Sequence, residues 1–176
     1  GTATSFIYDK LGRVTRSTDA LGHYEEYTLD ARGNRVTVLN KLGGITTNSF
    51  DRRSLLIQES IAVSGDYGSS YGTQSTTIVN TFEYDKRGNL TKTVNADNAA
   101  SASEKRVTLY AYDKLDRLTS KTGVAIATQL SGAMVTPTET YAYDKRGNLI
   151  ETKVEAVAGA TRTLISRTLL YYDALD

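Results

Sequence analysis

Aspartates that recur in one short pattern are the first candidates for catalytic residues in this chain. Two carboxylates held about 5–10 Å apart can perform acid–base hydrolysis. The candidates are Asp9, Asp30, Asp51, Asp85, Asp113, Asp144 and Asp173. Each one opens the same kind of local segment, so each has the same expected role in a turn. We therefore interpret them as structural residues and predict no catalytic site.

The other polar residues give no stronger candidate. His23 stands beside Tyr24 with no nucleophile or second histidine arranged around it, which indicates a surface strand residue. The segment 95–98, Asn-Ala-Asp-Asn, could offer oxygens to calcium but lacks a full ligand loop ending in Glu, so a plain loop is favoured. Without Cys the chain has no thiol nucleophile, disulfide or Cys-ligated metal. We predict no enzyme activity, no cofactor and no metal in this segment.

The charge and hydropathy patterns exclude two kinds of partner. The 21 basic and 20 acidic residues nearly cancel, which leaves no strong field for nucleic acid or anionic lipid. Basic pairs at 52–53, 86–87 and 145–146 stand in the expected turn tips, and we interpret them as solubilising. No apolar run approaches the roughly 20 residues of a transmembrane helix, so no membrane insertion is predicted. The chain opens with Gly1 and shows no signal-peptide pattern, so we expect a piece of a longer protein.

An internal repeat organises the whole chain. Its pattern is Tyr-Asp-x-x-Gly-(Arg or Asn)-(Leu or Val)-Thr, and the marker aspartates recur every 21 to 34 residues. Clear copies lie at 8–15, 84–91, 112–119 and 143–149, weaker ones at 29–34 and 50–55, and a seventh begins at 172. We predict a single repeat array over residues 1–176, with six repeats, a truncated seventh and no domain boundary.

The repeat pattern predicts a β-hairpin turn. The Asp side chain can accept the backbone N–H two residues further on, and the Gly takes the left-handed conformation that closes a three-residue loop with a bulge. The turn residues predicted in this way are Asp9, Gly12, Asp30, Gly33, Asp85, Gly88, Asp113, Asp144 and Gly147. Asp116 and Ser54 stand at the Gly position of two copies, and Asp tolerates that conformation better than Ser.

This turn also predicts the strand register. It pairs Tyr8 with Val14, Tyr112 with Leu118 and Tyr143 with Leu149 across the strands. In the second copy, Arg35 stands where this register expects an aliphatic residue, with Val36 one place later. A bulge is one solution, so the register of that hairpin stays open.

Alternation between the turns predicts the fold class. Aromatic pairs two residues apart, such as Phe6 with Tyr8 and Tyr141 with Tyr143, share one face of a strand. A second set of turns is expected at 19–22 and 40–43. We predict an all-β fold, an antiparallel meander of β-hairpins. The inserts near 62–76, 95–105, 123–138 and 156–163 are small and polar, which predicts surface loops along one edge of the sheet.

Tyrosines raise the question of binding. A row of Tyr on a sheet can stack on sugar rings, or it can fill a half-buried face with its hydroxyls in water. We favour the structural interpretation for the row. Tyr67 and Tyr71 lie in a Gly- and Ser-rich insert outside the repeat pattern, so they are the candidate partner-binding residues.

The array resembles the Rhs/YD-repeat family through these Tyr-Asp copies and the intervening Asp-x-Leu-Gly turn. That family includes bacterial Rhs polymorphic toxins, the BC component of Tc insecticidal toxin complexes, wall-associated YD-repeat proteins and, more distantly, teneurins. The resemblance implies a strip of hairpins that spirals into a hollow β-sheet shell, which in many members encloses a C-terminal toxic domain. The family's aspartyl autoprotease carries an Asp-Pro-x-Gly-Leu-like motif, and this sequence lacks it, because Pro137 follows Thr136.

The resemblance implies a structural role. We expect a β-shell segment that encapsulates or presents a C-terminal toxin domain, in a protein that is secreted or held at the bacterial cell surface. Its partners would be the neighbouring repeats of the shell and the toxin cargo. The alternative is a cell-surface adhesion module that binds carbohydrate or protein. Since open sheet edges invite pairing with another chain, we expect the isolated segment to self-associate.

Overall fold

The computed structural model describes residues 3–66, 73–99, 101, 104–128 and 132–172, and these residues form strands and turns without a helix. None of that described chain provides a helix with the length and hydrophobicity to span a bilayer. The chain divides into two compact units, one of residues 1–82 with 95–105, the other of residues 83–94 with 106–176.

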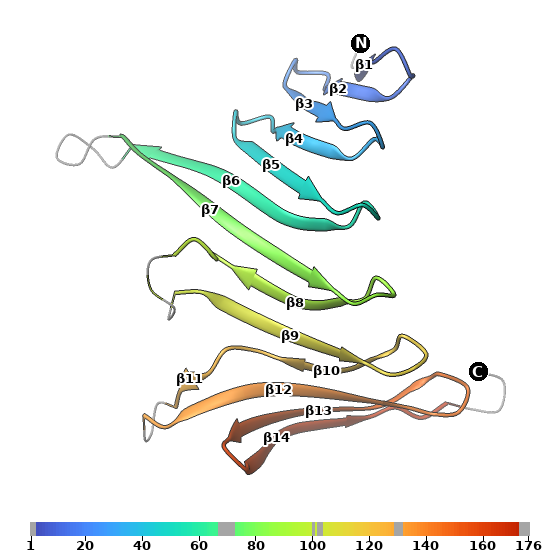
Figure 1. The fold of residues 1–176 in the computed structure, drawn as a ribbon, viewed down its shortest axis with the longest axis vertical. Helices are drawn as coiled ribbons and strands as arrows, with labels where there is room; N and C mark the ends of the chain where they lie inside the picture. The colour runs from blue at the N-terminus through green and yellow to red at the C-terminus, as the bar shows by residue number, and fades with distance from the viewer. Residues whose placement is uncertain (1–2, 67–72, 100, 102–103, 129–131, 173–176) are drawn as a thin grey trace. The chain divides into compact units, whose positions relative to one another are not determined.

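The first unit is an antiparallel meander in which each strand pairs with the next in chain order (Figure 1). Its strands are β1 (Ser5–Tyr8), β2 (Val14–Thr18), β3 (Tyr24–Leu29), β4 (Arg35–Leu39), β5 (Ile45–Phe50), β6 (Leu56–Asp66) and most of β7 (Thr73–Tyr84). Turns at 9–13, 30–34 and 51–55 therefore share one edge of the sheet, and turns at 19–23 and 40–44 share the other.

The second unit repeats this plan. It holds the end of β7, most of β8 (Leu90–Asn95), then β9 (Arg106–Tyr112), β10 (Leu118–Thr122), β11 (Ile126–Ala127), β12 (Met134–Tyr143), β13 (Leu149–Ala158) and β14 (Thr161–Leu169). The pairs β9–β10, β10–β12, β12–β13 and β13–β14 are antiparallel, and the short β11 pairs with β12. The predicted all-β meander of hairpins is confirmed.

The register predicted from the turn is confirmed as well. Tyr8 lies opposite Val14, Tyr112 opposite Leu118 and Tyr143 opposite Leu149. Immediately beyond each of these pairs the register shifts by one residue, so a β-bulge follows every such turn.

The bulge explains the threonine that ends the repeat pattern. The Thr15 hydroxyl donates to the Ile7 carbonyl at 3.3 Å, and the Thr119 hydroxyl donates to the Ala111 carbonyl at 3.1 Å. Thr91 makes the same bond to Glu83 at 3.1 Å. A hydroxyl at this place satisfies a carbonyl beside the interrupted ladder.

The hairpin of the second copy, whose register the sequence left open, has the same register as the other hairpins. Leu29 lies opposite Arg35, with the same shift beyond it. No additional bulge is needed, because the Arg35 guanidinium lies over the Tyr27 ring at 3.8 Å from its centroid. That contact places the cation on the ring face and keeps Tyr27 only 6% exposed.

Two of the predicted insert loops are largely strand, so those predictions were wrong. Residues 62–66 and 73–77 continue the β6–β7 hairpin, and residues 156–158 pair with 161–163 around a two-residue turn. Polar, small residues favour loops, but pairing with an adjacent strand satisfies the backbone and extends the ladder instead. Residues 134–138 of a third insert likewise belong to β12.

Strand β5 shows that the sheet of the first unit has one more sheltered face. In β5, Thr46, Asn48 and Phe50 are half-buried, while the alternate residues face solvent. Among the described residues, only Tyr27 and Val94 are buried apolar side chains. A sheet with so small a core depends on its turns and strand pairing for order.

Gly22 tests the backbone requirement of the turn. Its φ is +88°, and an added Cβ would meet no atom within 4 Å, so replacing it with Ala costs only backbone strain. We expect Gly22→Ala to lower the free energy of unfolding by about 1–2 kcal/mol, measured by urea denaturation. Leu21→Ala in the same turn, at a side chain 83% exposed, is the matched control and should stay within about 0.5 kcal/mol. Equal effects of the two changes would contradict the explanation.

Candidate functional site, a ladder of linked turns

Eight turns of the described chain are each closed by one oxygen of the Asp or Asn side chain that opens them. Asp9 Oδ1 accepts the backbone N–H groups of Leu11 at 2.8 Å and Arg13 at 3.0 Å. Asp19, Asp30, Asp51, Asp85, Asp113 and Asp144 accept the same two N–H groups in their turns. Asn40 does so through its amide oxygen, so the turn needs an acceptor and not a charge.

The fourth residue of each of these turns has a positive φ. It is Gly12, Gly22, Gly33, Gly43, Gly88 or Gly147, and in two turns it is Ser54 or Asp116, with φ of 64° and 62°. The predicted turn aspartates and glycines are thus brought together in pairs by each hairpin. Most of these carboxylates bind groups of their own turn, whereas Asp19 Oδ2 binds Lys41 of the turn at 40–44.

The second carboxylate oxygen binds the side chain that follows the glycine. Asp9 Oδ2 accepts from Arg13 Nε at 2.7 Å, and Asp113 Oδ2 accepts from Arg117 Nε at 2.7 Å. Where the pattern has Asn, its amide donates instead, from Asn34 to Asp30 at 2.8 Å. This role explains why the repeat alternates between Arg and Asn at one position, which the sequence alone did not reveal.

The same side chains reach the next turn along the edge. In the first unit, Arg13 Nη1 donates to the Asp30 carbonyl at 2.9 Å, and Asn34 Nδ2 donates to Ser54 Oγ at 3.1 Å. We call this series of turn-to-turn contacts the turn ladder. It joins residues 17 to 20 positions apart in the sequence.

The second unit has its own turn ladder. Asn89 Nδ2 donates to Asp116 Oδ1 at 2.6 Å, and Arg117 Nη1 donates to the Asp144 carbonyl at 3.3 Å. Arg87 Nη1 adds a bond to the Lys114 carbonyl at 2.8 Å. The interpretation of the tip arginines as solubilising was therefore wrong for Arg87, whose guanidinium binds the neighbouring turn.

The tyrosines of the repeat are used for structure. Tyr143 donates its hydroxyl to the Leu118 carbonyl of the preceding repeat at 2.8 Å, and Tyr172 donates likewise to Leu149 at 3.0 Å. Ring faces are covered by cations, since Arg117 lies 4.7 Å from the Tyr143 centroid and Arg16 lies 4.3 Å from that of Tyr24. In each of these two rings a cation occupies a face on which a sugar could otherwise stack. Tyr67 and Tyr71 lie outside the described residues.

Two tyrosines bind carboxylates beside them. The Tyr27 hydroxyl donates to Glu25 Oε2 and the Tyr141 hydroxyl to Glu139 Oε2, each at 2.7 Å. Burial and the Glu139 carboxylate raise the pKa of Tyr141 to about 12. These phenols stay protonated and donate to their partners throughout the ordinary pH range.

The turn carboxylates are held in their charged form. The hydrogen bond from Lys41, at 2.9 Å, lowers the pKa of Asp19 from 3.8 to about 2 against the opposing effect of burial. The Arg13 backbone N–H lowers the pKa of Asp9, and the Asn34 side chain lowers that of Asp30. The pKa is also lowered at Asp51, Asp85, Asp113 and Asp144.

The remaining candidates fit structural roles. His23 Nδ1 lies 3.6 Å from Asp19 Oδ2, and its side chain is 59% exposed. Asp97, in the segment weighed as a calcium loop, accepts from Lys105 Nζ at 3.0 Å and from the Thr81 hydroxyl at 3.1 Å. Within the described part of the chain, no three His, Cys, Asp or Glu residues gather as metal ligands would.

Comparisons with known proteins agree with this architecture. A sequence model of the RHS Repeat family matches residues 1–45. The crystal structure of TcdB2-TccC3 has a similar fold, with a TM-score of 0.56 and 21% identity over 93% of this chain and 10% of that chain. The crystal structure of TcdB2-TccC3-TEV gives a TM-score of 0.51 and 21% identity over 96% of this chain and 10% of that one. No curated protein sequence matches the chain significantly.

These findings confirm the resemblance to the Rhs/YD-repeat family. The family match is direct for residues 1–45, and the shared fold extends over nearly the whole chain. The chain spans about a tenth of the length of the solved structures it matches.

Arg117 tests the turn ladder. It binds Asp113 and the Asp144 carbonyl and covers the Tyr143 ring, so its removal should leave unsatisfied partners in two turns. We expect Arg117→Ala to lower the free energy of unfolding by about 1–2 kcal/mol in urea. Arg117→Lys should recover only part of this, because an ammonium lacks the planar fork that reaches both turns. Lys114→Ala, at an exposed tip of the same hairpin, is the control and should have little effect; a loss as large as that of Arg117→Ala would contradict the ladder.

Asp19 tests the charge on the turns. Because its pKa is lowered in the folded state, its charge contributes stability that is present above pH 3.8 and is lost as the pH falls toward about 2. Asp19→Asn keeps the turn acceptor, as Asn40 shows, but loses the ion pair with Lys41. The difference in free energy of unfolding between wild type and Asp19→Asn should therefore shrink over this interval, measured in urea at a series of pH values. A difference that stays constant from pH 6 to 2 would show that the ion pair contributes nothing.

Proposed function

We propose that the chain is a wall segment of an Rhs/YD-repeat β-shell that encloses or presents a C-terminal toxin domain. The repeat match at residues 1–45 and the fold shared with the TcdB2-TccC3 structures support a structural shell segment of this family. The cargo is the part of the proposal that follows from the family resemblance.

The turn ladder is the observation that carries the proposal. Within each unit it joins neighbouring hairpins at their ends, through bonds such as Arg13 to the Asp30 carbonyl and Arg117 to the Asp144 carbonyl. Stability then adds up from neighbour to neighbour, as in other repeat proteins, without a deep core. A thin sheet of linked hairpins is suited to a wall that separates its contents from the surroundings.

In this proposal the wall acts by sequestration and not by catalysis. The polar groups that could perform chemistry are committed to turns: each carboxylate accepts two backbone N–H groups and, in most turns, a side chain. The parent protein would be secreted or held at the bacterial cell surface, as members of the family are. Release of a cargo would be the task of another segment of the parent polypeptide.

Self-association of the isolated segment stays a prediction. The outer strands β1 and β14 have exposed residues along their whole lengths, as an unpaired edge does. An edge of this kind can pair with a second copy. Analytical ultracentrifugation should show assembly that grows with concentration, and a monomer unchanged by dilution would contradict it.

Adhesion through sugars is the alternative, and its candidates are Tyr67 and Tyr71. Among the described tyrosines, Tyr24, Tyr27 and Tyr143 offer less to a sugar, because a cation covers one face of each ring. If adhesion is the function, replacing both Tyr67 and Tyr71 by Ala removes binding on a glycan array. Binding that is unchanged by the replacement excludes these two residues.

The parent polypeptide provides the decisive test. We expect its mass and downstream sequence to show further repeats, a closing segment with an autoprotease motif and an unrelated C-terminal domain. Limited proteolysis of the purified parent should then spare that domain until the wall is denatured. An array that ends in a cell-wall anchor, with no cargo domain, would overturn the shell proposal and favour adhesion.

A further inference from the structure

The β6–β7 hairpin runs past the end of its neighbour β5 (Figure 1). The pairing between β5 and β6 extends from Phe50 opposite Leu56 to Thr46 opposite Ile61. The pairing between β6 and β7 continues further, to Asp66 opposite Thr73. Residues 62–66, which we call the β6 overhang, therefore have a strand partner on one side only, among the described residues.

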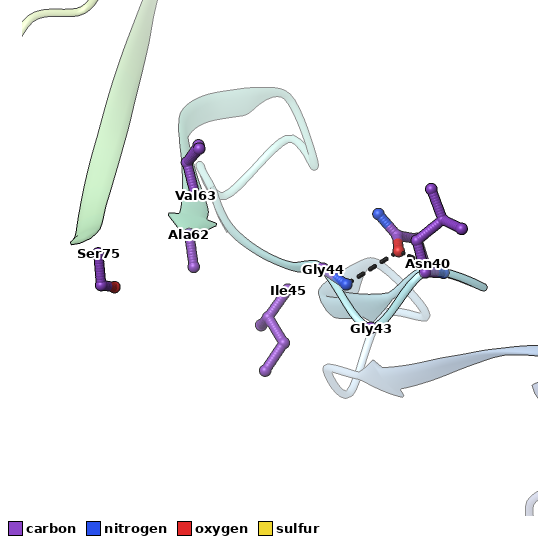
Figure 2. Close-up of a pocket in the computed structure, with 8 residues that line it drawn as sticks. Asn40, Gly43, Gly44, Ile45, Ala62, Val63 and Ser75 are labelled. Atoms are coloured by element: carbon purple, nitrogen blue, oxygen red, sulfur yellow. Dashed lines mark hydrogen bonds between the residues drawn. The ribbon is translucent and has the colours of Figure 1, made fainter. Parts of the chain in front are cut away.

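An open hollow of about 520 Å³ lies where β5 would continue. It is lined by Asn40, Leu42, Gly43, Gly44, Ile45, Ala62, Val63 and Ser75. Figure 2 shows the side chains of Ile45 and Ala62 pointing to the same side, and that of Val63 to the other. The hollow is thus the notch between the turn at 40–44 and the edge of the β6 overhang.

The surface of this hollow is mainly apolar and uncommitted. Leu42 is 96% exposed and Ile45 47% exposed. The polar side chain of Asn40 is occupied, since its Oδ1 accepts the N–H groups of Leu42 and Gly44 at 2.9 Å each (Figure 2). None of the described residues that line the hollow carries a charge. An occupant would gain most from an uncharged, apolar side chain at this place.

The second unit contains an overhang of the same kind that is filled. There β12 begins at Met134 and runs past β10, whose last pair is Thr122 opposite Thr138. The chain itself covers this stretch with β11: Ile126 lies opposite Val135 and Ala127 opposite Met134. A short, extended, apolar segment is therefore what this fold places on such an edge.

The β6 overhang carries few of the features that usually protect an open edge. Proteins protect such edges with charged side chains, above all Lys, and with Pro, a bulge or a covering segment. The overhang reads Ala-Val-Ser-Gly-Asp, in which the one charged residue, Asp66, stands at the far end, and its pairing with β7 shows no bulge. Every second residue of an antiparallel edge strand directs its N–H and C=O outward, so the overhang presents free donors and acceptors to an extended backbone.

We propose that the β6 overhang binds a short, extended, apolar segment of another polypeptide as an added antiparallel strand. Main-chain hydrogen bonds to residues 62–66 would hold the segment, and one of its apolar side chains would enter the hollow beside Leu42 and Ile45. The segment has the chemistry of β11, with small or branched apolar residues and no charge. This binding site is independent of whether the wall encloses a toxin domain.

The probe is a peptide with the sequence of residues 123–128, acetylated at its N-terminus, amidated at its C-terminus and labelled with a fluorophore. Added to the full 176-residue chain, it should bind saturably and protect backbone amides within 62–66 from hydrogen exchange. Leu42→Asp should weaken binding about tenfold or more, because a carboxylate would enter the apolar hollow. Ile45→Lys provides a second variant with the same expectation.

The matched control is Leu21→Asp. Leu21 holds the same position in the turn at 19–23 as Leu42 in the turn at 40–44, and it is 83% exposed but does not line the hollow. It should leave binding unchanged. Equal loss in Leu21→Asp and Leu42→Asp, or no new protection within 62–66, would overturn the proposal. So would protection that rises with protein concentration before any peptide is added, since the occupant would then be a second copy.

Discussion

A sheet with almost no packed core must set its strand register by local bonds, and here the turn carboxylate does so. Asp9 uses one oxygen to hold two backbone N–H groups and the other to orient Arg13. Arg13 then reaches the carbonyl of Asp30 in the next hairpin. The register of one hairpin and its attachment to the next thus depend on the same side chain. A slip by one residue would turn the aromatic face of a strand toward the other side of the sheet, and the turn prevents this slip.

Features that depend on contiguous residues could be predicted from the sequence. The turn involves five successive positions, so its acceptor, its left-handed residue and the pairing of Tyr8 with Val14 all follow from one short pattern. The meander follows from the spacing of the turns. Arg35 marks the limit of this reasoning: the pattern alone left its register open, and the answer depends on the ring of Tyr27 in the adjacent strand.

Features that join distant positions could not be predicted in this way. The partners of Asn89 and Arg117 in the turn ladder lie 27 residues away, and their identity requires knowledge of which turns share an edge. The bulge beyond the turns at 9–13, 30–34, 51–55, 113–117 and 144–148 became visible only in the pairing, although the Thr that satisfies it is part of the repeat. Insert composition was misleading, because backbone pairing to a neighbouring strand outweighs the weak preference of small polar residues for loops.

In our proposal, the inserts determine where the sheet binds a partner. The strands β2 to β5 are five or six residues long, and each pairs with a neighbouring strand on both sides. Where an insert lengthens one hairpin, its strands extend past the shorter neighbour and leave a one-sided edge, as β6 does beyond β5 and β12 does beyond β10. A segment of the same chain can pair with the exposed backbone groups, as β11 does with β12. At the β6 overhang we propose that a partner satisfies these groups, so that insert length would set the binding positions of the sheet while its turns stay the same.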